Sequence, residues 1–171
     1  MILDLGEMES YGIKVDGLIG DSFLKFLLVK IDYRNKILTL SSKTDESMMP
    51  RQGYSFKLRQ DHYGAIFVHL NPGKIQNKLV AQIDTGSGGE SYLTFPSNLL
   101  KKLKPELNCK LVKSGVGGVF GTQKAFYSRL ATLEMGEGLK VNNLPVEFFA
   151  FPNIVITNAF LSHFTVTINY P

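Results

Sequence analysis

The chain has 171 residues and a formal net charge of +4, with 44% hydrophobic and 20% charged residues. This length fits one domain or one and a half small ones, and the composition supports a packed core and argues against disorder. The 16 Gly and 7 Pro are spread along the chain, as short strands joined by turns require. We therefore predict an all-β protein.

The N-terminus and the longest apolar run argue against export and membrane signals on this chain. The opening MILDLGEMES is acidic, whereas a signal peptide begins with positive charge. The run from Phe23 to Ile31 contains two lysines and is too short to cross a bilayer. We expect a soluble chain with no membrane span, and the sequence leaves its compartment undecided.

Two segments match at a constant offset of 137 residues (160 − 23). The first runs from Gly17 through Phe23 to Tyr33, and the second runs from Ile154 through Phe160 to Tyr170. Each is predicted as an apolar strand, a tight turn, a short helical turn and an alternating strand, so the chain holds two copies of one structural unit. The first copy continues into Ile37–Leu40 as a hairpin.

The strongest motif, Asp84-Thr85-Gly86-Ser87, lies 73 residues before Thr157 (157 − 84). The equivalent point of the first copy, counted back from Gly20, falls before residue 1 (20 − 73 = −53). A polar stretch, residues 41–50, reads as a linker between the copies. We predict that residues 1–45 are the C-terminal part of an incomplete first lobe, and that residues 46–171 are a complete second lobe.

The motif sits between two predicted strands, Lys78–Ile83 and Tyr92–Phe95. A carboxylate on such a turn is placed rigidly and stays reachable, as a catalytic group must be. Thr85 can hydrogen-bond locally or to a partner turn, Gly86 lets its N–H approach the carboxylate, and Ser87 offers a hydroxyl to it. The competing interpretation is an ordinary turn led by Asp84.

These elements resemble the aspartic peptidases of the pepsin and retropepsin superfamily, and are most similar to bacterial two-lobed aspartyl proteases. Each lobe there supplies one DTG or DSG turn and one apolar-apolar-Gly loop behind it. The matches are Asp84–Ser87 with Val155-Ile156-Thr157, and Leu18-Ile19-Gly20 in the partial lobe. The resemblance implies an acid-protease-like lobe, a small closed barrel with a psi-type loop, and similar bacterial proteins are often exported. Thr157 replaces the expected Gly and could crowd the loop behind Asp84.

A glycine-rich run also resembles the flap that covers substrate in retropepsins. Its glycines are Gly115, Gly117, Gly118 and Gly121. A flexible hairpin tip can close over an extended peptide and exclude water. A plain surface hairpin is the alternative, while a phosphate-binding loop is disfavoured because the run does not lead from a strand into a helix.

Other residues give no sign of a cofactor or of nucleic-acid binding. The cluster Lys101-Lys102-Leu103-Lys104 lacks interleaved aromatics and indicates the solvent-facing side of a helix predicted over Ser97–Leu103, with Ser97 as its N-cap. Cys109 is the single cysteine, so no intrachain disulfide is predicted. The histidines are scattered and are interpreted as solvated strand residues: His62, His69 and His163. We expect no metal and no cofactor.

The resemblance implies an aspartic endopeptidase that holds an extended peptide under the flap. Its water would be activated by Asp84 and by a second aspartate from a missing N-terminal lobe or from a partner chain in a homodimer. The monomer alone is expected to be inactive, because one carboxylate cannot fill both roles. The alternative is a non-catalytic lobe that binds peptide. Nucleotide binding through the glycine-rich runs is the least favoured interpretation.

Overall fold

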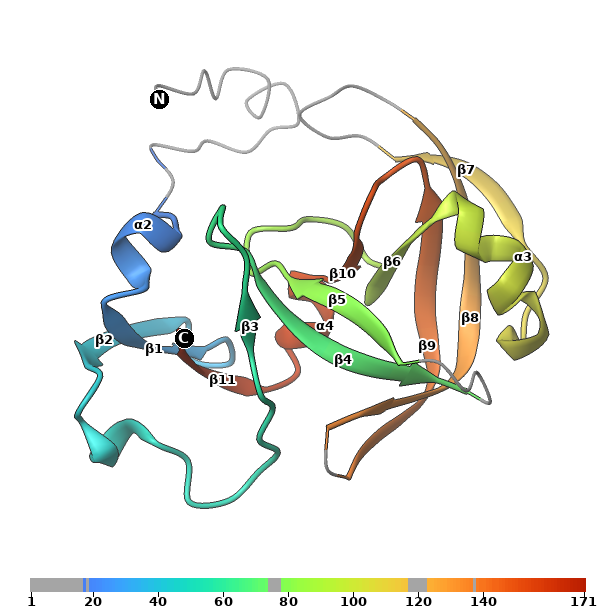
Figure 1. Cartoon of the computed structure of the whole chain (residues 1–171). Coiled ribbons are helices and arrows are strands. Elements are labelled where there is room, and N and C mark those ends of the chain that lie inside the picture. The colour runs from blue at the N-terminus through green and yellow to red at the C-terminus, as the bar shows by residue number, and fades with distance from the viewer. Residues whose placement is uncertain (1–16, 18, 74–77, 117–122, 137) are drawn as a thin grey trace.

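A computed structural model describes residues 17, 19–73, 78–116, 123–136 and 138–171 (Figure 1). Strands dominate it, which confirms the all-β prediction. One sheet has eight strands, and these are, in spatial order, β3 (Arg59–Gln60), β4 (Ile66–Pro72), β5 (Leu79–Ile83), β10 (Ile154–Ile156), β6 (Leu93–Pro96), β9 (Leu139–Phe149), β8 (Gln123–Met135) and β7 (Val112–Val116). The other sheet has three, in the order β11 (Thr165–Asn169), β1 (Leu27–Asp32) and β2 (Ile37–Ser42).

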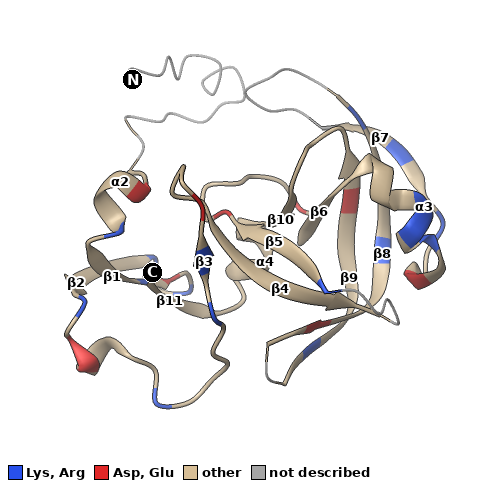
Figure 2. Cartoon of the chain, in the orientation of Figure 1, with Lys and Arg blue, Asp and Glu red and all other residues tan. Residues whose placement is uncertain are grey.

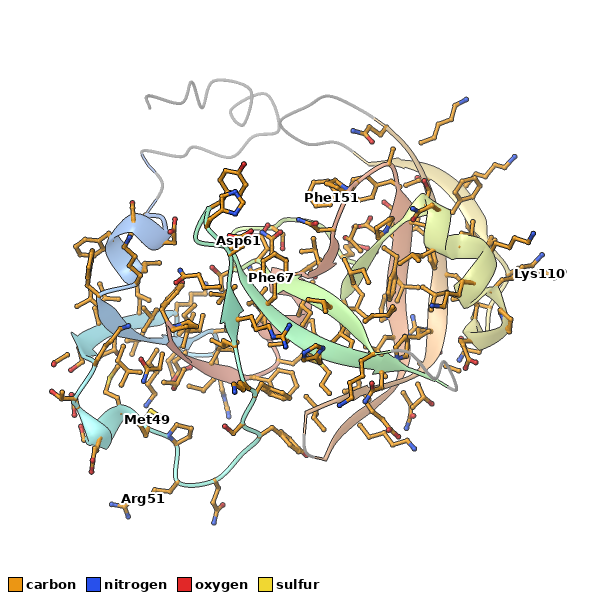
Figure 3. The ribbon with its side chains drawn as sticks, in the orientation of Figure 1. Met49, Arg51, Asp61, Phe67, Lys110 and Phe151 are labelled. Atoms are coloured by element: carbon orange, nitrogen blue, oxygen red, sulfur yellow. The ribbon has the colours of Figure 1, made fainter. Side chains whose placement is uncertain are left out.

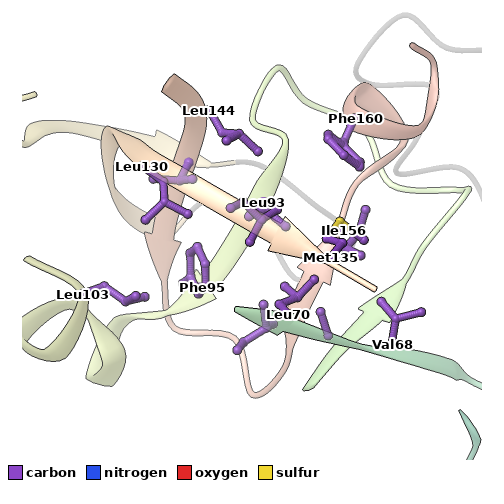
Figure 4. Packing of buried hydrophobic residues seen from close by; sticks show 14 of the residues in the cluster. Val68, Leu70, Leu93, Phe95, Leu103, Leu130, Met135, Leu144, Ile156 and Phe160 are labelled. Atoms are coloured by element: carbon purple, nitrogen blue, oxygen red, sulfur yellow. The ribbon is translucent and has the colours of Figure 1, made fainter. Parts of the chain in front are cut away.

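The larger sheet closes on itself because β4 pairs with β8 as well as with β5. Alternate residues of its strands point inward and form one apolar core, as the period-two pattern of a half-buried strand requires. Figure 4 shows part of this core. Its fully buried members are Leu70, Ala81, Leu93, Phe95, Leu103, Leu130, Leu133, Leu144, Val146, Phe148 and Ile156.

The helical segments of the described residues are short. They are α2 (Asp21–Leu24), α3 (Leu100–Leu103), α4 (Asn158–Leu161) and three 3-10 turns, Glu46–Met48, Ser97–Leu99 and Lys104–Glu106. In α3 the side chain of Leu103 is fully buried, whereas Lys101 and Lys102 are exposed. Basic residues recur over α3, β7 and β8 (Figure 2). The predicted capping by Ser97 is wrong, because the segment opens as a 3-10 turn after Pro96 and no side chain caps it.

The short strand β10 gives the barrel its psi-type loop, as predicted. It runs parallel to β5 on one side and antiparallel to β6 on the other, so it is threaded between two strands that are neighbours in sequence. Ile156 in β10 is fully buried. This threading places residues 154–157 directly beside the end of β5.

The repeat is present in the structure as well as in the sequence. Helices α2 and α4 are offset by the same 137 residues (158 − 21). In α2 the N–H groups of Phe23 and Leu24 donate to the carbonyl of Gly20, and in α4 the equivalent N–H groups donate to the carbonyl of Thr157. The strands that follow, β1 and β11, pair with each other in antiparallel fashion.

The two copies differ in burial. Ile156 is 0% exposed and Phe160 is 3% exposed, because both pack into the barrel core. Their counterparts in the first copy, Ile19 and Phe23, are 63% and 54% exposed. The same local unit is therefore packed against a barrel in one copy and largely open in the other.

The strand of the first copy is covered, although the unit before it is open. Leu28 and Val29 are 0% and 2% exposed. Pairing of β1 with β11 and β2 protects this strand, and Val29 packs with Ile66, Ile168 and Tyr170. Only Phe26, at 68% exposure, remains open among the larger side chains there. The domain division between residues 45 and 46 stays a prediction.

Candidate active site

Asp84 follows the last residue of β5 and is half-buried. Its N–H donates to the carbonyl of Ile156 at 3.1 Å, which extends the parallel pairing of β5 with β10 by one residue. Its Oδ1 accepts a hydrogen bond from the N–H of Gly86 at 2.9 Å. A Cβ at Gly86 would lie 3.5 Å from Oδ1, an ordinary contact, so glycine here gives close approach without being sterically obligatory.

Ser87 joins the turn to the helix behind it. Its Oγ donates to the carbonyl of Asp84 at 2.9 Å and accepts from the N–H of Asn158 at 2.9 Å. The sequence suggested that this hydroxyl would serve the carboxylate, but it bonds backbone groups instead. Ser87 therefore fixes the position of the turn relative to α4.

Thr157 occupies the place where the resemblance led us to expect glycine. Its side chain is 2% exposed, and its Oγ1 donates to the carbonyl of Ser91, while its N–H donates to the carbonyl of Tyr92 at 3.1 Å. The hydroxyl thus satisfies backbone acceptors of the segment that follows the turn. The hydroxyl and the N–H of Thr157 therefore bond residues 91 and 92, a contact that residue types and spacing do not reveal.

The remaining predicted site residues are less closely defined. Thr85 is half-buried. Gly115 lies in β7 and pairs with Lys124 of β8. The predicted flap residues Gly117, Gly118 and Gly121 lie outside the described residues. His62 and His69 are exposed, and His163, also exposed, is hydrogen-bonded through Nε2 to the hydroxyl of Tyr92.

Neither a metal centre nor a membrane span is found in the part of the chain that the structure describes. No three His, Cys, Asp or Glu side chains are grouped there as ligands. Within the same residues, no helix is long and apolar enough to span a bilayer.

Comparisons with known proteins give matches among solved structures but none by sequence. No family model matches the chain, and no curated protein matches it. Among the solved structures that match is a retropepsin-like aspartic protease from Rickettsia conorii. It is 15% identical, with a TM-score of 0.47, and the match covers 63% of this chain and 85% of that one.

Proposed function

We propose that this chain carries one half of an aspartic endopeptidase site, with Asp84 as one of two catalytic carboxylates. The observation that carries the proposal is the fixation of the Asp84 turn. Its two sides are tied to the threaded segment behind it, through Asp84 N–H to Ile156 and through Asn158 N–H to Ser87. The carboxylate is thus held by backbone that cannot easily shift, which suits a catalytic group.

The chemistry explains why a second carboxylate is required. One ionised carboxylate takes a proton from water as the water oxygen attacks the carbonyl carbon of the peptide bond. The other carboxyl, protonated, donates to the carbonyl oxygen, and a proton then passes to the leaving amine. Two adjacent carboxylates share one proton because like charges oppose double ionisation. Asp84 alone cannot take both parts.

The open face of the first copy supports a second lobe as the source of that carboxylate. Ile19 and Phe23 occupy the repeat positions of Ile156 and Phe160, which are buried in the barrel behind Asp84. A barrel packed on Ile19 and Phe23 in the same way would place its own catalytic turn beside residue 20. We favour such a lobe over a simple homodimer, because one edge of β11 is already paired with β1.

The test combines a peptidase assay with a measurement of mass. The purified chain is assayed with a fluorogenic peptide at acid pH, with and without a transition-state-mimicking inhibitor, beside light scattering. We expect no turnover from the monomer, and inhibitor-sensitive turnover from an assembly that holds two catalytic turns. Turnover by a species shown to be monomeric would overturn the proposal that this chain carries only half of the catalytic site. Peptide binding without turnover in any assembly would favour the alternative, a non-catalytic lobe that binds peptide. The observation behind this alternative is that the chain contains a single Asp-Thr-Gly turn.

A further inference from the structure

A buried carboxylate lies outside the barrel core. Glu147 of β9 is 7% exposed, and Thr94 of the neighbouring strand β6 is 4% exposed. The Oγ1 of Thr94 donates to Oε1 of Glu147 at 2.7 Å. A carboxylate removed from water in this way is costly unless it is paired or well hydrogen-bonded, so its surroundings bear on function.

Strand alternation places this pair on the face of the sheet opposite to the core. The residues on either side of Thr94, Leu93 and Phe95, are fully buried in the core, as are those on either side of Glu147. Successive side chains of a strand point to opposite faces, so Thr94 and Glu147 point away from the barrel interior.

The same face carries Asp84. Cross-strand register joins Gln82 of β5 to Val155 of β10, Val155 to Thr94, and Thr94 to Glu147. On the other side of β5 the same row reaches Phe67 of β4 (Figure 3). Asp84 directly follows β5 and its N–H continues the pairing with β10, so strand alternation places it on the same side as Gln82. Glu147 lies three strands from Gln82, roughly 14 Å at about 4.8 Å per strand.

Tyr127 completes this group from the next strand. It lies directly opposite Glu147 in the pairing of β8 with β9. Burial raises the pKa of the Tyr127 phenol, and the charge of Glu147, a hydrogen bond to Glu147 and the charge of Glu90 raise it further. Glu90 belongs to the segment that follows the Asp84 turn. The phenol and the Thr94 hydroxyl are therefore two O–H groups at one carboxylate.

Among the described residues, this carboxylate has no cation. The ion pair found among the described residues joins Lys140 to Glu134 and does not involve Glu147. Arg129, two residues from Tyr127 on the same side of β8, donates its guanidinium hydrogen bonds to Asn143 instead. On the same side of β8, Gln123 Oε1 is a buried acceptor without a partner. This side of the sheet thus offers negative charge and acceptors, and the positive group described on it, Arg129, is bonded to Asn143 and not to Glu147.

We propose that Glu147, together with Thr94 and Tyr127, forms a subsite for the ammonium or guanidinium group of a Lys or Arg side chain in a bound peptide. Such a group has several donors and no acceptor, which complements this face. Asp84 lies two residues beyond Gln82, about 7 Å further along the sheet at about 3.4 Å per residue, so about three residues of an extended peptide and a long side chain reach from Asp84 to Glu147. The inference rests on the proposed function, because it assigns a substrate preference to the same proposed peptidase site.

The test measures binding, so that it does not depend on turnover. Extended peptides with a reduced, uncleavable bond are titrated into the chain and followed by NMR, with one position carrying either Lys or its neutral analogue norleucine. The varied position is moved along the peptide. We expect the Lys peptide to bind about tenfold to a hundredfold more tightly at one position, the factor of one charged hydrogen bond. In Glu147→Gln the ratio of the two Kd values should fall to about one.

Two further variants make the result decisive. Glu134→Gln removes an exposed carboxylate of the same barrel and should leave the ratio unchanged, and Thr94→Val should reduce the ratio in part while retaining the charge. Equal Kd values for the two peptides at every position, or a ratio that survives in Glu147→Gln, would overturn the subsite. Hydrolysis of peptides without a preference for Lys would overturn the subsite and leave the proposed peptidase function standing. Lys-selective binding without hydrolysis in any assembly would overturn the peptidase function and leave the subsite standing.

Discussion

Lys30 and Thr167 lie opposite each other in the pairing of β1 with β11, and each is the counterpart of the other in the repeat, since 167 − 30 equals 137. The pairs on either side, Val29 with Ile168 and Ile31 with Val166, are likewise exchanged by the repeat. The strands β1 and β11 lie side by side (Figure 1), and the exchanged pairs define a local two-fold axis through the Lys30–Thr167 pair. This symmetry supports the proposed second lobe, because the axis that relates the two copies would also relate two barrels.

The first prediction concerns the catalytic carboxylate. In any assembly that cleaves peptides, Asp84→Asn should lower kcat by at least about 10²- to 10⁴-fold, the range for loss of a general acid or base. The amide oxygen can still accept from the N–H of Gly86, so the free energy of unfolding should change by less than about 0.5 kcal/mol. Asp32→Asn, at the last residue of β1, is the matched control for activity. Retained activity in a folded Asp84→Asn protein would defeat the assignment.

The second prediction compares the two repeat copies by urea unfolding. Phe160→Ala should lower the free energy of unfolding by about 3–5 kcal/mol, because the ring is 3% exposed in the core. Phe23→Ala, at 54% exposure, should cost less than about 1 kcal/mol in the chain alone. In an assembly with a second lobe the Phe23 cost should rise towards the Phe160 value. A low cost there as well would argue against a barrel on this face.

The third prediction tests the polar contact behind the turn. Thr157→Val removes the donor to the buried carbonyl of Ser91, so it should cost about 1–3 kcal/mol of unfolding free energy. Thr157→Ser keeps the hydroxyl and is the matched control. Calorimetric melting of both proteins gives the comparison. A loss confined to Thr157→Ser would show that the methyl group, and not the hydrogen bond, accounts for the stabilisation.

The fourth prediction uses the Tyr127 phenol as a probe of Glu147. The pKa of Tyr127 lies above its ordinary value of 10.0, so the neutral phenol is favoured in the folded protein. This contribution to stability is present below pH 10.0 and is lost as the pH rises through the raised pKa. Glu147→Gln should lower the pKa of Tyr127 towards the ordinary value, which absorbance of the phenolate measures, with Tyr127→Phe to identify the signal. An unchanged pKa of Tyr127 in Glu147→Gln would show that the two side chains do not interact.

The sequence by itself determined the features that depend on local chemistry. The Asp84 turn between two strands, the alternation of the strands and the equivalence of Phe23 with Phe160 were all readable from residue types and spacing. Turn residues and period-two patterns act over a few neighbours, and a repeat needs only comparison along the chain. The threaded loop at residues 154–157 was predicted because the resemblance supplied its topology.

Only the tertiary structure decided which distant residues meet. Glu147 joins the face of Asp84 through three cross-strand registers, and a shift of one residue in any of them would turn it to the other face. Pairing of β1 with β11 buries Leu28 and Val29, which local pattern alone left open. The physical reason is the same in both cases. Register and closure follow from contacts between segments far apart in the chain, and no short stretch of sequence contains them.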